Sequence, residues 1–202
     1  MEKKRAYERT EKRQAETIEA VIELCGSSNP STLTTSDIAK GINLSQGALF
    51  KHFPNKGNLW EAVAKWMAKQ MIDKVFRVSE QYQSPIRALE AMFLAHISFI
   101  SKKPGVPKLM LGELQKPDKV GARVIIDHVL NDYRDRVILL LREGVLKNEI
   151  RNDIDIEAAA ISYLGSVQGL IIQSLILNDM AMAKDYAARV FEIFKAGIEV
   201  SR

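Results

Sequence analysis

Apolar residues recur at helical spacing through most of this chain. Ala15, Ile18, Ile22 and Cys25 fall on one stripe of a 3.6-residue helix, which predicts a first helix ending near Cys25. The same spacing predicts longer helices over residues 56–78, 85–100, 118–147, 156–177 and 183–198. The alternating pattern of a half-buried strand does not occur. With the short helices described below, the sequence predicts an all-α fold of about nine helices.

Several of these helices begin at residues that are favoured at helix N-termini. Asn55 and Asp155 can accept hydrogen bonds from the free amides of a first turn, and Ser84 precedes a first-turn proline, Pro85. The helix that Pro85 opens is apolar on almost every side, so we expect it to be surrounded by protein. Flanking prolines and glycine allow at most a short helix over residues 107–115.

Residues 33–53 contain two short helical patterns, each with its own start signal. Thr34 is a hydroxyl N-cap, and Asp37 stands three residues later as the reciprocal member of a capping box. Ser45 can cap the second helix in the same way. Two pairs of apolar residues stand where hydrophobic staples would pack, Leu33 with Ile38 and Leu44 with Leu49. We therefore expect two capped helices in succession.

The residues between these helices favour a sharp reversal. Gly41 and Asn43 both tolerate the left-handed backbone that such a turn needs. The apolar positions that could pack both helices on the first one are Ile38, Ala39, Leu44, Leu49 and Phe53. This arrangement is a helix-turn-helix, whose second helix presents its N-terminal residues to the major groove of DNA. Gln46 would face base edges there and can pair with adenine, while Gly47 and Ala48 allow close approach.

Composition and charge are compatible with this interpretation without requiring it. The chain is 47% hydrophobic and 27% charged, as in ordinary globular proteins, and its length allows one large domain or two units. A net charge of +4 fits a polyanionic partner, although it also serves solubility. Residues 1–13 hold six basic groups against three acidic ones, which makes either a basic arm or a solvated terminus. The six are Lys3, Lys4, Arg5, Arg9, Lys12 and Arg13.

The single cysteine and the apolar segments bear on the compartment. Cys25 has no partner for an intramolecular disulfide, which fits a reducing environment, and we expect it to be a small buried residue. The most apolar stretch, Ala158 to Leu177, is interrupted by serines and glutamines, so a buried helix is expected rather than a membrane span. The chain begins with charged residues and no apolar signal core. We therefore expect a cytoplasmic protein without a membrane partner.

The segment from Leu33 to Lys56 closely resembles the N-terminal module of TetR-family transcription regulators, which include the AcrR-like repressors. The residues that carry the resemblance are Leu33, Thr34, Thr35, Ile38, Ala39, Leu44, Ser45, Gly47, Leu49, Phe50, His52, Phe53, Asn55 and Lys56. The pattern covers roughly residues 10–66, and the helix order downstream is also similar to that of the family. The resemblance implies a DNA-binding domain over residues 1–56 and a helical ligand-binding and dimerisation domain over residues 57–202. We expect no cofactor or metal, because the sequence has neither a metal-ligand pair at helical spacing nor a glycine-rich phosphate loop.

The resemblance assigns roles to individual positions of the helix-turn-helix. Base-reading positions are matched by Ser36, Gln46, Gly47 and Ala48. Contacts with the DNA backbone are implied for Thr35, Ser45, Phe50, Lys51, His52 and Lys56. Phe50 stands where tyrosine is usual, so a phenolic hydrogen bond to phosphate is not available. Ile42 and Asn43 replace the usual Ala-Gly of the turn, which could alter the crossing of the two helices.

The helix from Ala158 to Leu177 mixes small and large apolar residues, which allows close packing with other helices. It can be a core helix of one protomer, or it can pair with the last helix in a four-helix homodimer interface. We favour the dimer because an isolated reader of one half-site gains little specificity. The interface residues expected from this pattern are Tyr163, Val167, Leu170, Ile171, Ser174, Phe191 and Phe194.

Two histidines lie among apolar residues in the C-terminal part. His96 belongs to the apolar helix over residues 85–100, and His128 lies on the next long helix with Tyr133. Each histidine is either a satisfied core residue or a polar anchor in a ligand cavity. The expected lining of such a cavity, suited to a largely apolar effector, is Phe93, His96, Ile97, Ile100, Met110, Leu114, His128 and Tyr133.

Two other function classes compete with a ligand-released repressor of an operator in double-stranded DNA. An enzyme has little support, because the three histidines and Cys25 are well separated and a glycine-rich phosphate loop does not occur. A helical scaffold without DNA contact would explain the core helices but not two consecutive capped helices with basic flanks. We therefore expect a transcriptional regulator that is not an enzyme.

Overall fold

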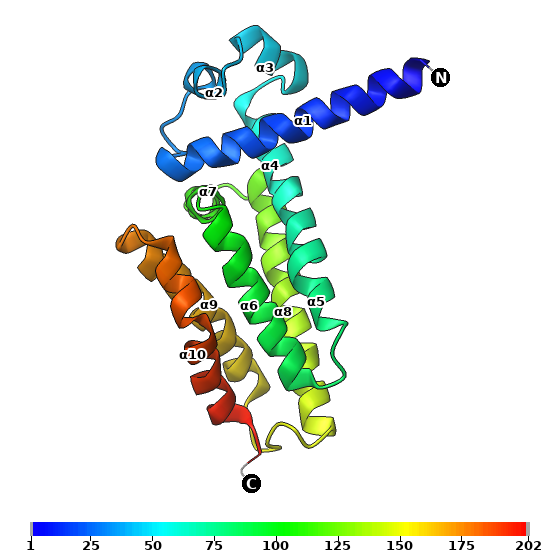
Figure 1. The fold of residues 1–202 in the computed structure, drawn as a ribbon, viewed down its shortest axis with the longest axis vertical. Coiled ribbons are helices and arrows are strands. Elements are labelled where there is room, and N and C mark those ends of the chain that lie inside the picture. Colours follow the sequence, from blue (N-terminus) through cyan, green and yellow to red (C-terminus); the bar gives the residue numbers. More distant parts are fainter. Residues whose placement is uncertain (1, 201–202) are drawn as a thin grey trace. The chain divides into compact units, whose positions relative to one another are not determined.

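The computed structural model describes the backbone of residues 2–200 and the side chains of residues 11–200. The described chain is helical with short connections, which confirms the all-α fold predicted from the hydrophobic spacing (Figure 1). The helices are α1 (Glu2–Ser27), α2 (Thr35–Gly41), α3 (Gln46–His52), α4 (Lys56–Met71), η1 (Ile72–Phe76), α5 (Arg77–Ser79), α6 (Pro85–Lys102), α7 (Gly105–Leu114), α8 (Ala122–Leu146), α9 (Ile156–Ile176) and α10 (Met180–Ile198). Because α4, η1 and α5 follow one another without a break, the described residues form nine continuous helices.

The helix starts predicted from capping residues are present. Asn55 Oδ1 accepts from the amide of Asn58 at 2.9 Å, and Asp155 Oδ1 accepts from that of Ala158 at 3.0 Å. Ser84 Oγ accepts from the amide of Arg87 at 3.3 Å, just before the first-turn proline of α6. The short helix expected over residues 107–115 begins earlier, at Gly105, because Pro107 lies in the first turn, where a missing amide proton costs no hydrogen bond.

The described chain divides into two compact units. The first consists of Met1–Ala68 and Lys103–Ile126, and the second of Lys69–Lys102 and Asp127–Arg202. The functional division expected near residue 56 stays a prediction, because a division by compactness does not show which part binds what. Each unit has its own buried apolar residues and is described separately below.

The core of the first unit forms where α1 meets the other helices of that unit. Val21 and Ile22 of α1, Ile38 of α2 and Leu49 of α3 are buried, together with Leu59 of α4. The thiol of Cys25 lies in the same core, as predicted, and burial raises its pKa to about 11. The stripe that the sequence predicted on the first helix is therefore the surface on which the short helices are fixed.

Helix α7 packs on α1 through a close approach of the two backbones. A Cβ at Gly105 would lie 1.9 Å from the carbonyl oxygen of Ile22 and 2.9 Å from the amide nitrogen of Gly26. Lys108, one turn further along α7, donates from Nζ to the carbonyl oxygen of Gly26 at 2.5 Å. This hydrogen bond satisfies a carbonyl at the C-terminal end of α1 that has no partner within the helix. Gly105 is therefore required for the packing of α1 on α7.

The core of the second unit is an aromatic cluster between α6, α8, α9 and α10. Phe93 and Tyr163 meet edge to face with ring centroids 5.5 Å apart, and Phe191 and Phe194 extend the cluster from α10. The hydroxyl of Tyr163 donates to the carbonyl oxygen of Leu89 at 2.8 Å, which satisfies it inside the core. Edge-to-face ring pairs of this kind stabilise a core beyond the area they bury.

Helix α9 was expected to be a buried helix, and the structure shows it buried on one face. It packs on α6 and α10, which lie beside it (Figure 1). Its length and composition would also allow a membrane span, and 39% of its apolar window is buried in the protein. Length and composition are weak evidence for a span, because core helices share them. The exposed apolar face is described with the dimer residues below.

Candidate nucleic-acid interface

Helix α2 begins with the capping box predicted from the sequence. The hydroxyl of Thr34 accepts from the amide of Asp37 at 3.1 Å, and Asp37 Oδ2 accepts from the amide of Thr34 at 2.9 Å. Hydrogen bonds from Thr34 to the carboxylate favour its charged form and lower the pKa of Asp37. A carboxylate with a lowered pKa stabilises the fold above its unfolded pKa, and this contribution is lost as the pH falls. The start of α2 is thus fixed by local chemistry.

The turn between α2 and α3 uses one left-handed residue. Asn43 has a φ of 56°, as the sequence predicted for this turn. Gly41 tolerates the same conformation but does not adopt it in the structure. It is the last residue of α2, and a Cβ there would lie 2.8 Å from Cδ2 of Leu24 on α1. Gly41 therefore serves the close packing of α2 on α1.

Helix α3 has a buried inner side and an exposed N-terminal end. Ser45 Oγ accepts from the amide of Ala48 at 3.1 Å, which confirms the predicted N-cap. Leu49 is 1% exposed and Phe53 is also buried, so these two residues fix α3 to the core. Gln46 and Gly47 are exposed and Ala48 is half-buried. The end of the helix that a helix-turn-helix presents to DNA is therefore accessible.

A hydrogen bond joins the N-terminal ends of α2 and α3. Gln46 Nε2 donates to the hydroxyl oxygen of Thr35 at 3.1 Å, so a predicted base-reading residue contacts a predicted backbone-contacting residue. Ser36, the other base-reading candidate, is exposed next to Thr35. This hydrogen bond orients the amide of Gln46 at the surface before any partner is bound. Such preorganisation reduces the side-chain entropy that binding would cost.

The residues expected to contact the DNA backbone differ in their surroundings. Ser45, Phe50 and Lys51 are exposed, and Thr35 is half-buried. His52 is half-buried beside Phe53 and, with Arg13 of α1, lines a groove of about 350 Å³ between α1 and α3. Of the basic arm, only Lys12 and Arg13 have described side chains, and those of Lys3, Lys4, Arg5 and Arg9 lie outside the described residues.

Lys56 lies in a different environment from the other backbone-contact candidates. Its side chain is half-buried, and Nζ lies 5.7 Å from the centre of the Trp60 ring one turn along α4. Burial lowers the pKa of Lys56, and the nearby charge of Lys116 lowers it further. Lys56 therefore contacts Trp60. The sequence does not mark this tryptophan as functional, because tryptophan at helical spacing is typical of an ordinary core.

Residues 18–63, which include the whole helix-turn-helix, match the model of the family described as bacterial regulatory proteins of the tetR family. Over these residues the chain is similar to TetR-family regulators. Nucleoid occlusion factor SlmA from Aliivibrio fischeri strain MJ11 is 24% identical over 165 residues, which are 81% of this chain and 84% of the relative. SlmA from a Marinomonas strain is 22% identical over 79% of this chain and 81% of the relative.

Solved structures with this fold cover nearly the whole chain. The ketosteroid transcriptional regulator KstR2 of Mycobacterium tuberculosis superposes with a TM-score of 0.78 at 17% identity, covering 94% of this chain and 96% of that one. The regulator FadR of Bacillus subtilis, in complex with stearoyl-CoA, has a TM-score of 0.77 at 19% identity and covers 92% of this chain and 99% of that one. The family matched over residues 18–63 is described as regulatory proteins, and both of these solved structures are named as regulators.

The residues expected to line an effector cavity fall into two groups. Phe93, Ile97, Ile100 and Tyr133 are buried in the second unit, where Nδ1 of half-buried His96 lies 3.3 Å from the hydroxyl oxygen of Tyr133, within hydrogen-bonding distance. Burial lowers the pKa of His96 to about 4, so its ring is neutral at pH 7. Met110 and Leu114 are half-buried in the first unit, and His128 is exposed on α8.

The structure places the seven predicted interface residues inside one protomer. Tyr163, Val167, Leu170, Ile171, Ser174, Phe191 and Phe194 are all buried in the second unit. The stripe chosen from the sequence therefore faces the protomer's own core. A second stripe of large apolar residues is exposed on the same two helices, and it comprises Ile161, Ile172, Ile176 and Leu177 with Tyr186 and Ile193.

Replacing Gly47 with alanine should change the stability of the fold and the affinity for DNA in opposite directions. A Cβ at Gly47 meets no heavy atom within 4 Å, so the substitution should raise the free energy of unfolding by about 0.5–1 kcal/mol. Close approach of α3 to base edges would be obstructed, and affinity for a selected operator should fall about tenfold, as for one lost base contact. Urea unfolding and gel-shift titration measure the two effects. Unchanged affinity would place the DNA away from this end of α3.

Proposed function

We propose that this chain is a sequence-specific transcriptional regulator that binds its operator as a homodimer and is released by a small, largely apolar ligand. The observation that carries the proposal is the capped and exposed N-terminal end of α3, with Gln46 held at its surface by Thr35. An amide side chain at this position can make two hydrogen bonds to adenine in the major groove. The flanking basic and polar residues supply contacts with phosphates, which fix the register on the duplex.

The test is selection of bound sequences from random duplex DNA, followed by titration of two variants. Gln46→Ala should relax the preference at one base pair by about 1–3 kcal/mol, while other positions keep theirs. Lys51→Gln changes an exposed lysine of the same helix. It should lower the affinity for all DNA sequences alike, and the affinity should depend less steeply on salt concentration. Equal losses on every sequence for both variants, or binding indifferent to salt, would contradict the proposal.

The homodimer is supported by the exposed apolar stripe on α9 and α10. Ile193 of α10 borders a groove of about 400 Å³ between the two helices, and Ile176 extends the apolar surface along α9. Gly165 and Gly169 on α9 have open space where a Cβ would lie, so a second backbone can approach closely. A two-fold pairing through this surface presents two reading helices to two half-sites.

The effector is proposed to bind near the polar pair formed by His96 and Tyr133. This pair is placed among apolar and aromatic residues, and the π-helical segment η1 brings Phe76 within 5.5 Å of the Tyr133 ring, centroid to centroid. Single π-helical turns occur often at functional sites. The Bacillus subtilis FadR, with stearoyl-CoA in its complex, is an example of the fold with a ligand that has a long apolar part. A ligand acts here by preferring the conformation that fits the operator less well.

The neutral state of His96 predicts a pH dependence of stability. The unfolded histidine takes up its proton near pH 6.5, whereas burial delays protonation in the folded chain to about pH 4. The unfolded state therefore binds more protons between these values, and the free energy of unfolding should fall as the pH drops from 6.5 towards 4. We expect a loss of about 2 kcal/mol, allowing for partial exposure of the ring.

The measurement is urea unfolding of the wild type, His96→Gln and His128→Gln between pH 8 and pH 4. His128→Gln, which changes an exposed histidine, should keep the slope of the wild type, and His96→Gln should lose most of it. Carboxylates titrate in all three proteins, so the difference between variants isolates His96. Identical slopes would show that His96 is protonated in the folded chain as readily as in the unfolded one.

A second candidate function is nucleoid occlusion, because the relatives with the printed name SlmA match about four-fifths of this chain at 22–24% identity. Both functions use the same DNA-reading end, so binding to DNA does not distinguish them. Mapping the bound sites over the chromosome does. A regulator of transcription should occupy sites next to the promoters it controls, whereas a nucleoid occlusion factor should occupy sites without regard to promoters.

A further inference from the structure

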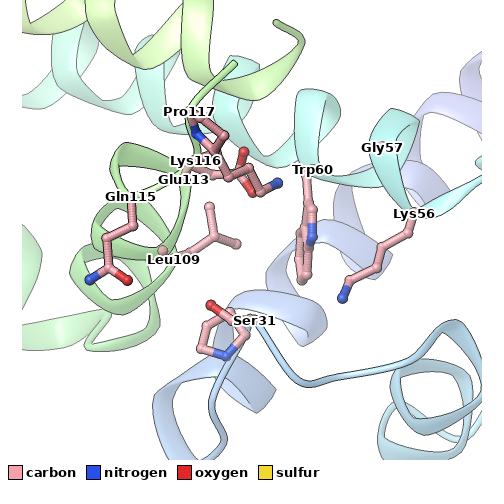
Figure 2. A pocket seen from close by; sticks show the side chains of 11 residues that line it. Ser31, Lys56, Gly57, Trp60, Leu109, Glu113, Gln115, Lys116 and Pro117 are labelled. Carbon is pink, nitrogen blue, oxygen red and sulfur yellow. The ribbon is translucent and has the colours of Figure 1, made fainter. Parts of the chain in front are cut away.

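A pocket of about 400 Å³ in the first unit lies where three separate segments of that unit meet (Figure 2). The loop between α1 and α2 contributes Pro30 and Ser31, and the start of α4 contributes Lys56, Gly57 and Trp60. The end of α7 and the residues after it complete the lining with Leu109, Gly112, Glu113, Gln115, Lys116 and Pro117. The volume is within the range of pockets that hold small organic molecules. The pocket is formed without His96 or Tyr133.

Two lysines give the pocket its positive end. Figure 2 shows the side chains of Lys56 and Lys116 both reaching toward Trp60. Lys116 Nζ lies 2.5 Å from Oε1 of Glu113, a carboxylate that is buried, so this one acid is already paired. Nζ of Lys56 lies 5.7 Å from the centre of the Trp60 ring, and burial and the charge of Lys116 both lower the pKa of Lys56. An anion placed between the two amines would offset both the cost of burying the Lys56 charge and its repulsion from Lys116.

The other walls of the pocket suit a compact apolar group. Trp60 and Leu109 form its inner wall, and both are almost completely buried. Two prolines, Pro30 and Pro117, complete the apolar part, while Ser31 and Gln115 can donate hydrogen bonds at its edge. A charged end beside an apolar wall selects molecules that carry both kinds of surface. Inorganic anions would satisfy only the lysines, and neutral apolar molecules would leave the amine of Lys56 without an anion beside it.

We propose that this pocket binds a small organic phosphate or carboxylate, with the anionic group between Lys56 and Lys116 and the apolar body against Trp60. The inference goes beyond the effector site proposed above, since the pocket belongs to the unit that contains the helix-turn-helix. Two ammonium groups can each donate to one anionic oxygen, and such charge-assisted hydrogen bonds are stronger than neutral ones.

A ligand in this pocket would regulate DNA binding through Lys56, a consequence that rests on the proposed function. The family resemblance gives Lys56 a contact with a DNA phosphate, yet here its amine reaches into the pocket. One ammonium group cannot hold a ligand anion against Trp60 and a DNA phosphate outside at the same time. Binding of the ligand and of DNA should therefore oppose each other by the same factor in both directions.

The experiment uses phenyl phosphate as the probe and the full chain without DNA, with affinity measured by calorimetry. We expect saturable binding with one site per chain, weaker binding of inorganic phosphate, and no detectable binding of phenol. Lys56→Gln should lower the affinity for phenyl phosphate at least about tenfold, as expected for the loss of one charge-assisted hydrogen bond. Lys65→Gln changes an exposed lysine of the same helix outside the pocket and should leave the affinity unchanged.

A second variant guards against a simple loss of folding. Lys116→Gln alone would leave Glu113 buried without its partner, so it is combined with Glu113→Gln, which keeps the pair neutral. The double variant should fold with the wild-type midpoint and also lose at least about tenfold in affinity. Phenyl phosphate affinity that is undetectable, or unchanged in both pocket variants, would overturn the proposal. Because no DNA is present, this outcome is independent of the operator selection that tests the proposed function.

Discussion

Replacing Gly105 with alanine is expected to destabilise the first unit by about 3 kcal/mol or more, the upper end of what overpacking costs. The new Cβ would lie 1.9 Å from the Ile22 carbonyl oxygen and 2.9 Å from both the Ile22 carbonyl carbon and the Gly26 amide nitrogen. These are backbone atoms of α1, so a rotamer change cannot move them aside. The helices must separate, which weakens the hydrogen bond from Lys108 and the core around Cys25. Urea unfolding followed by tryptophan fluorescence measures the effect, since Trp60 and Trp66 both belong to this unit.

Gly47→Ala is the matched control for this substitution, because it adds the same methyl group to a helix of the same unit in open space. It should shift the unfolding midpoint slightly upward, whereas Gly105→Ala should shift it far downward. A wild-type midpoint for Gly105→Ala would mean that α1 and α7 do not approach as closely as these distances require. The comparison thus tests the packing of two helices through one pair of residues.

The parts of this fold that the sequence predicted correctly are those with local causes. The capping box of Thr34 and Asp37, the N-cap at Ser45 and the left-handed Asn43 each depend on atoms within a few residues of one another. The exposure of Gln46 follows from them, because a capped helix with Leu49 in the core leaves its N-terminal end outward. For these reasons the local structure of the helix-turn-helix could be predicted from the sequence, while the contacts of its residues with DNA stay a prediction.

The parts that could not be predicted depend on contacts between distant segments. Gly41 and Gly105 look like ordinary turn residues in the sequence, and only the position of α1 explains their missing side chains. The pocket beside Trp60 is equally invisible in the sequence, because its lining comes from three segments separated by up to about fifty residues. Apolar periodicity likewise shows that a helix has an apolar stripe, but α9 and α10 have two each. The stripe expected from the sequence at the dimer interface is the buried one, and the other stripe is exposed.

Replacing Ile193 or Ile176 with glutamate is expected to convert the proposed homodimer into a folded monomer. These side chains are 76% and 69% exposed, so the substitutions should leave the protomer's own core intact. In a dimer through α9 and α10, the substitution would bury two glutamates, one from each protomer, without a positively charged partner. A monomer cannot bind two half-sites at the same time, so operator affinity should fall about 100-fold or more. Light scattering after gel filtration measures the mass, and gel shifts measure the affinity.

Leu146→Glu is the control for this prediction, because it places the same charge on a residue of α8 that is 83% exposed. It should keep both the dimeric mass and the operator affinity, which would separate an effect of the α9 and α10 surface from a general effect of added negative charge. If all three variants stayed dimeric with wild-type affinity, the exposed stripe on α9 and α10 would not be the interface. If Ile193→Glu became monomeric but kept its operator affinity, a single α3 would suffice for recognition. The requirement for two half-sites, from which the dimer was inferred, would then fail.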